Sequence, residues 1–191
     1  MNYLIYESAV MNNITEVKKL NGVIEFVTVL QEADAKNRNG RIYPKVVIDA
    51  ALKSPLINEK LRTKSLVGEA GHPFSQDISR QTNVDLRNAA FRINEMWWKD
   101  NLLMGRCETL NTALGRDMAG LIEQGFVPSF SMRGQGNVVR DASRDALVVQ
   151  SPLAIITWDW VWLPSHETAY MESICEETKD SMFNINNNKE V

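Results

Sequence analysis

The stretch ALVVQSPLAIITWDWVW at 146–162 is rich in β-branched and aromatic residues and predicts a long β-strand. Near its end the residues alternate, which puts Trp158, Trp160 and Trp162 on one face of the strand and Asp159 on the other. Core packing or a dimer surface explains this tryptophan stripe better than a cation-binding cage does. The strand therefore predicts a sheet that carries a carboxylate on the face opposite the stripe.

Other segments add strands more often than helices. Strands are expected at 22–31, 65–69, 126–132 and 136–140, with a hairpin made of 84–99 and 102–110. Helices are expected at 44–53, 58–62 and 113–123 and from Ser165 to about 176, and the polar segment 74–83 is expected to be a surface loop. With no regular β-α-β alternation, the pattern predicts an α+β fold with a central antiparallel sheet or small barrel. We expect one domain over 1–176 and a loose polar tail at 177–191.

Composition narrows the class of protein. The 191 residues are 44% hydrophobic and 24% charged, which is typical of a soluble globular protein. A net charge of −3 gives no basic field for nucleic acid, and no apolar run approaches the ~18 residues of a membrane span. The N-terminus is too polar for a signal peptide, so we expect an intracellular protein without nucleic-acid or membrane partners.

The cysteines and histidines show no metal-binding pattern. Cys107 and Cys175 are the two cysteines, and whether they pair cannot be judged from sequence. Together with His72 and His166 they form no Cys-x-x-Cys or His-x-x-x-His spacing. We therefore expect neither a metal site nor another cofactor.

Two short segments could carry chemistry. GEAGHP at 68–73 places His72 in a glycine-rich turn, and SFSMRG at 129–134 places Ser131 at the end of an apolar run. A serine hydroxyl needs a base to become nucleophilic, and histidine suits that task. Ser129 lies on the same strand face and competes for the role. Taken singly, a surface histidine bonded to a loop carbonyl and a strand-end serine are the simpler interpretations.

Four blocks in order resemble the signatures of tailed-phage prohead proteases. They are NRNGRIYP at 37–44, GEAGHP at 68–73, SMRG at 131–134 and WDWVWLPS at 158–165. The family is related in fold to the herpesvirus assemblins, whose proteases are small β-barrels surrounded by helices. The resemblance therefore implies that fold here. This sequence has Met132 where the family often has a second serine.

The resemblance also implies catalytic roles. His72 would be the general base, Ser131 the nucleophile, and Asp159 the acid that orients the base. Assemblins use a second histidine as the third member, which makes His166 an alternative. We favour Asp159, because Ser165 is expected to start a helix that leaves His166 exposed in its first turn. Glu69 is a weaker option.

Four further residues are candidates for the oxyanion or the substrate. A turn at Gly134 beside Arg133 would offer backbone N–H groups to an oxyanion. Prohead proteases commonly cut after glutamate, so Arg133 or Arg41 could also bind an acidic side chain, and Arg38 competes with them. A solvated surface position is an equally good interpretation of each of the three arginines.

The function implied is a serine endopeptidase that matures phage capsids. It would act inside the prohead, or in the host cytoplasm during assembly, on scaffold, internal and capsid proteins and on itself. Self-cleavage after Glu176, Glu177 or Glu190 would trim the tail, and a homodimer is worth testing because assemblins dimerise. The alternatives are a structural particle protein with a protease-like fold, and an esterase or amidase with a deep apolar pocket beside Ser131.

Overall fold

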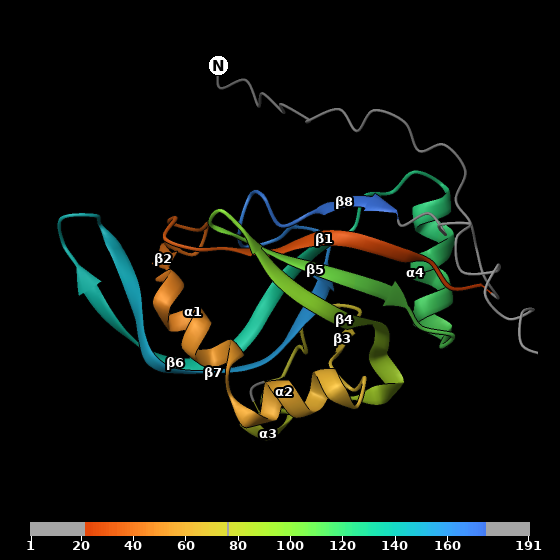
Figure 1. Ribbon diagram of the computed structural model, residues 1–191, viewed down its shortest axis with the longest axis horizontal. Helices are drawn as coiled ribbons and strands as arrows, with labels where there is room; N and C mark the ends of the chain where they lie inside the picture. Colours follow the sequence, from red (N-terminus) through yellow and green to blue (C-terminus); the bar gives the residue numbers. More distant parts are fainter. Residues whose placement is uncertain (1–21, 76, 175–191) are drawn as a thin grey trace, which may run out of the picture.

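The computed structural model describes residues 22–75 and 77–174, which form two sheets with helices at the periphery (Figure 1). The strands are β1 (Glu25–Glu32), β2 (Arg41–Ile42), β3 (Val67–Glu69), β4 (Ala89–Lys99), β5 (Leu102–Thr109), β6 (Ser129–Asp141), β7 (Ala146–Val161) and β8 (Met171–Ile174). The helices are α1 (Lys45–Leu52), α2 (Pro55–Arg62), α3 (Ile78–Thr82) and α4 (Ala113–Glu123), with a 3₁₀ turn at Leu86–Asn88. The expected α+β class with antiparallel sheets is confirmed.

Of the two expected forms, an antiparallel sheet or a small barrel, the described residues form sheets and no closed barrel. One sheet has the order β3-β4-β5-β1-β8 and the other the order β2-β7-β6, with β2 and β7 parallel and the other pairs antiparallel. Single bridges from Ala70 to Trp160 and from Ser129 to Tyr170 join the two sheets. A barrel needs continuous ladders at its closing edges, and isolated bridges do not supply them. A relation in fold to the assemblins stays a prediction.

Aromatic side chains fill the space between the sheets. The ring of Phe130 on β6 stacks on Phe26 of β1 with centroids 5.7 Å apart and meets Phe91 of β4 edge-on at 4.9 Å. Trp158 on β7 is fully buried in the same core, whereas Trp162, just past the strand, is 84% exposed. The tryptophan stripe is thus core at one end and surface at the other.

Two of the expected helices begin close to where the sequence indicates. Pro44 precedes α1 with an extended backbone, and Thr112 caps α4 by accepting a hydrogen bond from Gly115 N (3.0 Å). The buried face of α1 is Val47, Ile48 and Ala51. The apolar run at 46–48 allows more than one face to be buried, and packing selects the one that contains Ile48.

The structure corrects three other expectations. The segment at 74–83 contains the short helix α3, which is capped by Asp77 and buries none of its residues, so no apolar periodicity announced it. The strands expected at 126–132 and 136–140 are one strand, β6, with irregularities next to Gly134 and Gly136. No helix starts at Ser165: the segment at 165–170 is turns, followed by β8, which pairs with β1.

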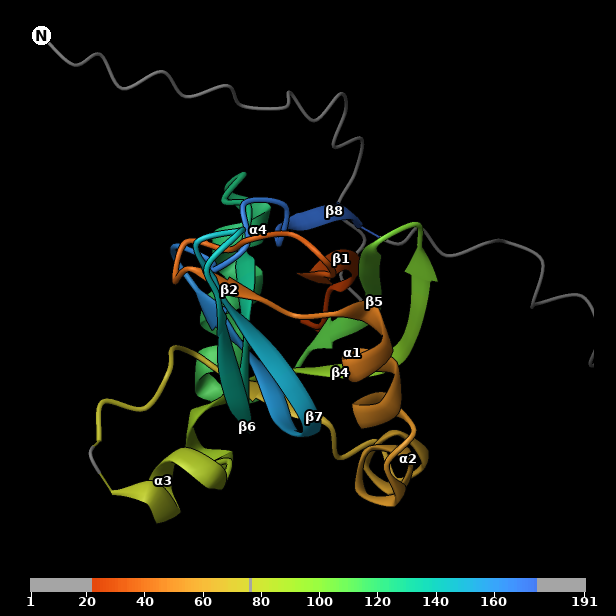
Figure 2. The same cartoon turned by 90° about the vertical axis from the view of Figure 1, so that its left-hand side faces the viewer.

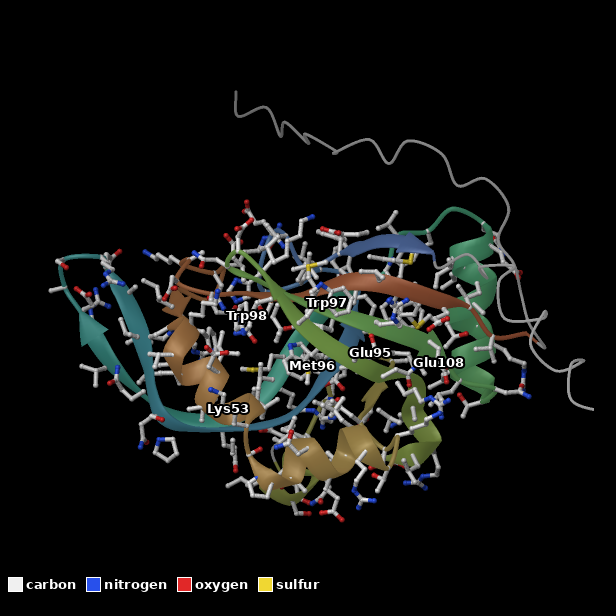
Figure 3. All side chains as sticks on the ribbon, viewed as in Figure 1. Lys53, Glu95, Met96, Trp97, Trp98 and Glu108 are labelled. Carbon is white, nitrogen blue, oxygen red and sulfur yellow. The ribbon has the colours of Figure 1, made fainter. Side chains whose placement is uncertain are left out.

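Polar contacts fix the outer face of β4 and β5. Figure 3 shows Glu95 and Glu108 along these strands, where Glu95 lies 3.2 Å from Arg106 and Glu108 pairs with Arg92. At the far end of β4 the indole of Trp98 donates a hydrogen bond to Asp49 of α1 (2.7 Å). This contact ties α1 to the larger sheet.

The described helices include none that is long and apolar enough to cross a membrane. Cys107 lies buried in β5, whereas Cys175, the tail at 177–191 and the proposed cleavage sites lie outside the described residues.

Replacing Phe130 by alanine is expected to lower the free energy of unfolding by about 3–5 kcal/mol, because the cavity removes two ring contacts between the sheets. Urea denaturation measures the change. Phe74→Ala is the matched control, since that ring is fully exposed, and its stability should stay within about 0.5 kcal/mol of the parent. An equal loss in both variants would contradict the packing described.

Candidate active site

The pairing of β6 with β7 sets the first two residues of the site. Ser131 and Asp159 are directly opposite in this antiparallel ladder, so their side chains project from the same face. That face is the one turned away from Trp158, as expected from the alternation. Asp159 is fully buried and Ser131 is 7% exposed.

A tight turn after β3 brings His72 to this face. Ala70 forms a parallel bridge with Trp160, and Gly71 N donates to Trp160 O (2.7 Å). Gly71 has a φ of +90°, a conformation that favours glycine, and it turns the chain back over β7. His72 Nδ1 then lies 2.7 Å from Asp159 Oδ2. A proton on Nδ1 donated to this carboxylate leaves Nε2 as the acceptor nitrogen of the ring.

The two serines of β6 have different partners. Ser129 is buried and its hydroxyl donates to the backbone oxygen of Val161. Ser131 Oγ donates to Ser165 Oγ at 3.2 Å, and no hydrogen bond joins it to His72 in the part of the chain that the structure describes. Ser129 therefore serves the sheet, while Ser131 faces the loop that carries Ser165.

The first of the four sequence blocks holds this loop in place. Asn37 Oδ1 accepts hydrogen bonds from the backbone N–H groups of Asn39 (3.0 Å) and Arg41 (2.9 Å). Arg38 donates from Nη1 to Pro164 O (2.7 Å) and from its backbone N to Ser165 O (2.9 Å). The sequence analysis gave Asn37 no role and expected Ser165 only to start a helix, although both belong to the blocks that carry the resemblance.

Arg133 is a buried member of a charged cluster. Its Nε lies 2.9 Å from Asp159 Oδ2, and its Nη2 lies 2.8 Å from Glu69 Oε1. The side chain is 8% exposed, so the interpretation of Arg133 as a solvated surface arginine is wrong. Its charge is directed at two carboxylates behind His72.

Glu69 is held ionised by its neighbours. Burial raises the pKa of this carboxyl, but hydrogen bonds from Arg80, the Asp85 backbone N–H and Arg133 outweigh burial and lower the pKa to about 2. In the described residues Glu69 makes no hydrogen bond to His72. Its carboxylate instead pairs with Arg80 and Arg133.

Gly134 lies within a strand, so the expected turn there is wrong. It follows an irregularity in the β6–β7 ladder, and a Cβ at this position would come within 2.9 Å of Ala154 O. The close approach of β7 accounts for the glycine. Arg41 is in β2, and among the described residues no hydrogen bond or ion pair links it to His72, Ser131 or Asp159.

His166 is buried, which contradicts the exposed helical turn expected for it. It is 4% exposed, and its ring meets Tyr43 edge-on with centroids 6.1 Å apart. Burial lowers the pKa of His166 to about 4, so the ring is neutral at neutral pH. The hydrogen-bond partner of His72 Nδ1 is Asp159 and not this histidine.

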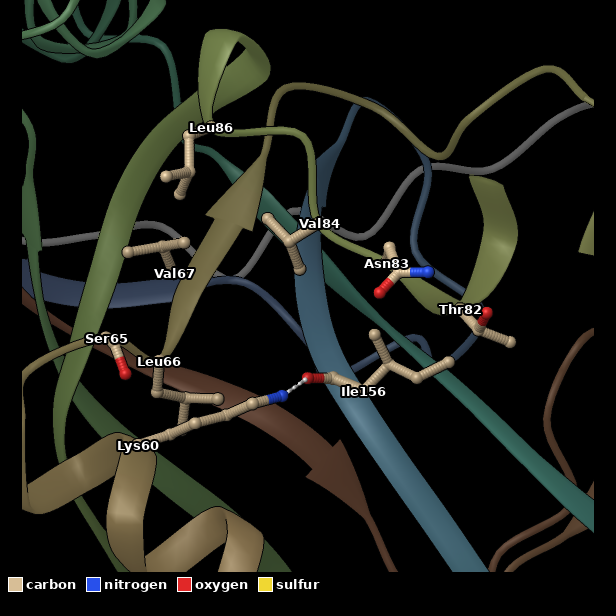
Figure 4. A pocket seen from close by; sticks show the side chains of 9 residues that line it. All are labelled: Lys60, Ser65, Leu66, Val67, Thr82, Asn83, Val84, Leu86 and Ile156. Atoms are coloured by element: carbon tan, nitrogen blue, oxygen red, sulfur yellow. Dashed lines mark hydrogen bonds between the residues drawn. The ribbon is translucent and has the colours of Figure 1, made fainter. Parts of the chain in front are cut away.

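A pocket of about 180 Å³ lies farther along β7 (Figure 4). It is lined by Lys60, Ser65, Leu66, Val67, Thr82, Asn83, Val84, Leu86 and Ile156. Lys60 Nζ donates to Ile156 O (3.0 Å), and burial, followed by the Arg133 charge, lowers the pKa of Lys60. Neither Ser131 nor His72 lines this pocket, so it is not the pocket beside Ser131 that an esterase would need.

Within 22–75 and 77–174 no group of three or more histidine, cysteine, aspartate or glutamate side chains could hold a metal ion. The site offers the Asp159 carboxylate of β7, the Ser131 hydroxyl of β6 and the imidazole of His72, which reaches the same face from the turn after β3.

Comparison with known proteins shows which family the chain belongs to. Residues 8–180 match the model of the family described as prohead core protein serine protease. The chain belongs to this family. It is also 33% identical to the prohead core protein protease of Enterobacteria phage T4 over 145 residues, which are 75% of this chain and 65% of that protein. The chain thus spans less than two thirds of that relative.

A solved structure supports the same membership of the prohead protease family. The bacteriophage T4 capsid assembly protease superposes with a TM-score of 0.64 at 31% identity, covering 73% of this chain and 81% of the other. The expected resemblance to tailed-phage prohead proteases is confirmed.

The buried imidazole of His166 predicts a pH effect on stability. Its pKa rises from about 4 in the folded chain to about 6.5 on unfolding, so the unfolded state binds more protons between these values. The free energy of unfolding should therefore fall as pH decreases from 6.5 to 4, and by less in His166→Phe. Urea denaturation at pH 7 and pH 5 measures this difference. The same decrease in both proteins would be evidence against a neutral buried ring.

Proposed function

We propose that this chain is a serine endopeptidase that cleaves proteins of the phage prohead. The observation that carries the proposal is the 2.7 Å contact between His72 Nδ1 and the buried Asp159, on the face where Ser131 lies opposite Asp159 in the β6–β7 ladder. Family membership over 8–180 supports the same chemistry.

The proposed mechanism assigns one role to each residue. Asp159 holds His72 with Nε2 free and stabilises the imidazolium that forms. His72 removes the proton of Ser131 as Oγ attacks the scissile carbonyl, and it then protonates the leaving amine. Water activated by His72 hydrolyses the acyl-enzyme. The hydroxyl of Ser131 must leave Ser165 Oγ for this step, and catalytic hydrogen bonds are often long or absent in free enzymes.

The proposed substrates are proteins of the particle. We assign scaffold, internal and capsid proteins, and the chain itself, because the related T4 proteins are a prohead core protease and a capsid assembly protease. The reaction would take place inside the prohead, and the chain would be in the host cytoplasm during assembly. Cleavage after glutamate is proposed from the resemblance, and a homodimer remains a prediction.

A structural particle protein without turnover is the second candidate. The 7% exposure of Ser131 and its hydrogen bond to Ser165 favour it, because a nucleophile must reach the substrate. The same variants that test catalysis separate the two candidates.

Ser131→Ala and His72→Ala should each abolish processing of a co-expressed capsid or scaffold protein. Each removes a group that forms or breaks a bond, so the loss is expected to exceed about a thousandfold. Electrophoresis measures the loss, and mass spectrometry of the new termini identifies the residue before the cut, expected to be glutamate. Ser129→Ala is the matched control: its hydroxyl bonds to backbone, and cleavage should continue. Continued processing in both Ser131→Ala and His72→Ala would overturn the assignment.

Asp159→Asn should keep the fold and lower kcat by about a thousandfold or more, because an amide that donates to Nδ1 selects the wrong tautomer. Cleavage rates of a peptide taken from the identified site give the value. The variant tests Asp159 separately from the alternatives, since Glu69 and His166 remain. A rate within about threefold of the parent would rule out Asp159 as the third residue.

A further inference from the structure

Four charged side chains form a series of ion pairs that ends at His72. Arg80 Nη1 lies 3.0 Å from Glu69 Oε1, and the same oxygen lies 2.8 Å from Arg133 Nη2. Arg133 Nε lies 2.9 Å from Asp159 Oδ2, which lies 2.7 Å from His72 Nδ1. The charges alternate in sign along the series. Its inner end is the contact between Asp159 and His72.

The middle of the series is cut off from solvent. The side chains of Glu69, Arg133 and Asp159 are 1%, 8% and 0% exposed, whereas that of Arg80 is 27% exposed. A buried charge that loses its partner keeps the cost of its lost hydration, so each member constrains the next. The position of Asp159 therefore depends on charges that lie beyond its immediate contacts.

The series also attaches α3 to the site. No residue of α3 is buried, so apolar packing does not hold this helix. Instead Arg80 pairs with Glu69, and Arg133 Nη1 donates to the backbone oxygens of Gln81 (3.2 Å) and Asn83 (3.3 Å). In Figure 2, α3 lies to one side of the β6–β7 hairpin, with α1 on the other side.

We infer that Arg80, acting through Glu69 and Arg133, is a positioning residue for Asp159 and His72. The guanidinium of Arg80 holds the Glu69 carboxylate in place, and this carboxylate aligns Arg133. Arg133 in turn orients the Asp159 carboxylate toward His72 Nδ1. The effect on catalytic rate rests on the proposed function. The effect on the protonation of His72 is independent of the proposed function.

The sign of each charge predicts a direction. Asp159 from β7 contacts His72, and Arg133 from β6 contacts Asp159. Glu69 from β3 and Arg80 from α3 follow in the series, with Asp85 beside Arg80 and Lys60 from α2 beside Arg133. Removing the positive charge of Arg80 favours the imidazolium form of His72. Removing the negative charge of Glu69 disfavours it.

An NMR titration of the full chain tests the inference without substrate. The chain has two histidines, and the His72→Gln variant assigns their ring signals. The titration midpoint of His72 should move to higher pH in Arg80→Ala and to lower pH in Glu69→Gln. It should return close to the parent value in the double variant. Arg80→Lys keeps the charge and should keep the midpoint.

Arg87→Ala is the matched control. Arg87 pairs with Asp85 and its side chain is 89% exposed, so its removal should leave the midpoint of His72 in place. Shifts of Arg80→Ala and Glu69→Gln in the same direction, or no shift in Arg80→Ala, would overturn the inference. If Glu69→Gln fails to fold, the midpoints of Arg80→Ala and Arg80→Lys alone test the inference, because Arg80 is partly exposed.

A kinetic measurement adds the effect on rate. With a cleaved peptide, Arg80→Ala should lower kcat about tenfold or more with little change in KM, since misorientation affects the reacting groups. Arg80→Lys should recover most of the loss. If the parent cleaves nothing while the two midpoints move in opposite directions, the proposed function fails and the positioning inference stands. An unchanged kcat in Arg80→Ala would overturn the inference and leave the protease assignment intact.

Discussion

An ionised carboxylate that is cut off from water must be compensated by its neighbours, and Asp159 imposes this constraint on the structure. Its side chain has no solvent exposure. Oδ1 accepts from Glu69 N at 3.1 Å and Oδ2 faces His72 and Arg133. Desolvating a carboxylate without such partners costs several kcal/mol, so β3, β6 and the His72 turn must all meet β7 at this residue.

Backbone pairing supplies the precision of the site. The β6–β7 ladder places Ser131 opposite Asp159, and a slip by one residue would send both side chains to other partners. Irregularities in the ladder follow between Arg133 and Gly134 and between Gly136 and Val138. Figure 1 shows the far end of the β6–β7 hairpin extending away from the rest of the protein. The buried Phe130 next to Ser131 anchors the same strand in the core. Core packing thus sets the register on which the site depends.

Sequence reasoning succeeded where local rules decide the outcome. Alternation in 146–162 predicted a strand with Asp159 opposite the tryptophans, and the helix expected at 113–123 is α4. It failed where charge or long-range contact decides. Helix α3 has no buried residue and so no periodic pattern, and a buried His166 is indistinguishable in sequence from an exposed one. The family blocks marked His72 and Ser131, but not the ion pairs of Arg80.

The bridge between the two sheets explains why the site lies beside the end of β3. At the edge of β3 a single bridge from Ala70 to Trp160 replaces a ladder. Had that ladder continued, residues 71–73 would be fixed as a strand beside β7. Gly71, at a φ of +90°, instead turns the chain so that His72 reaches Asp159. The incomplete closure that distinguishes this fold from a barrel therefore leaves the backbone free to place the histidine.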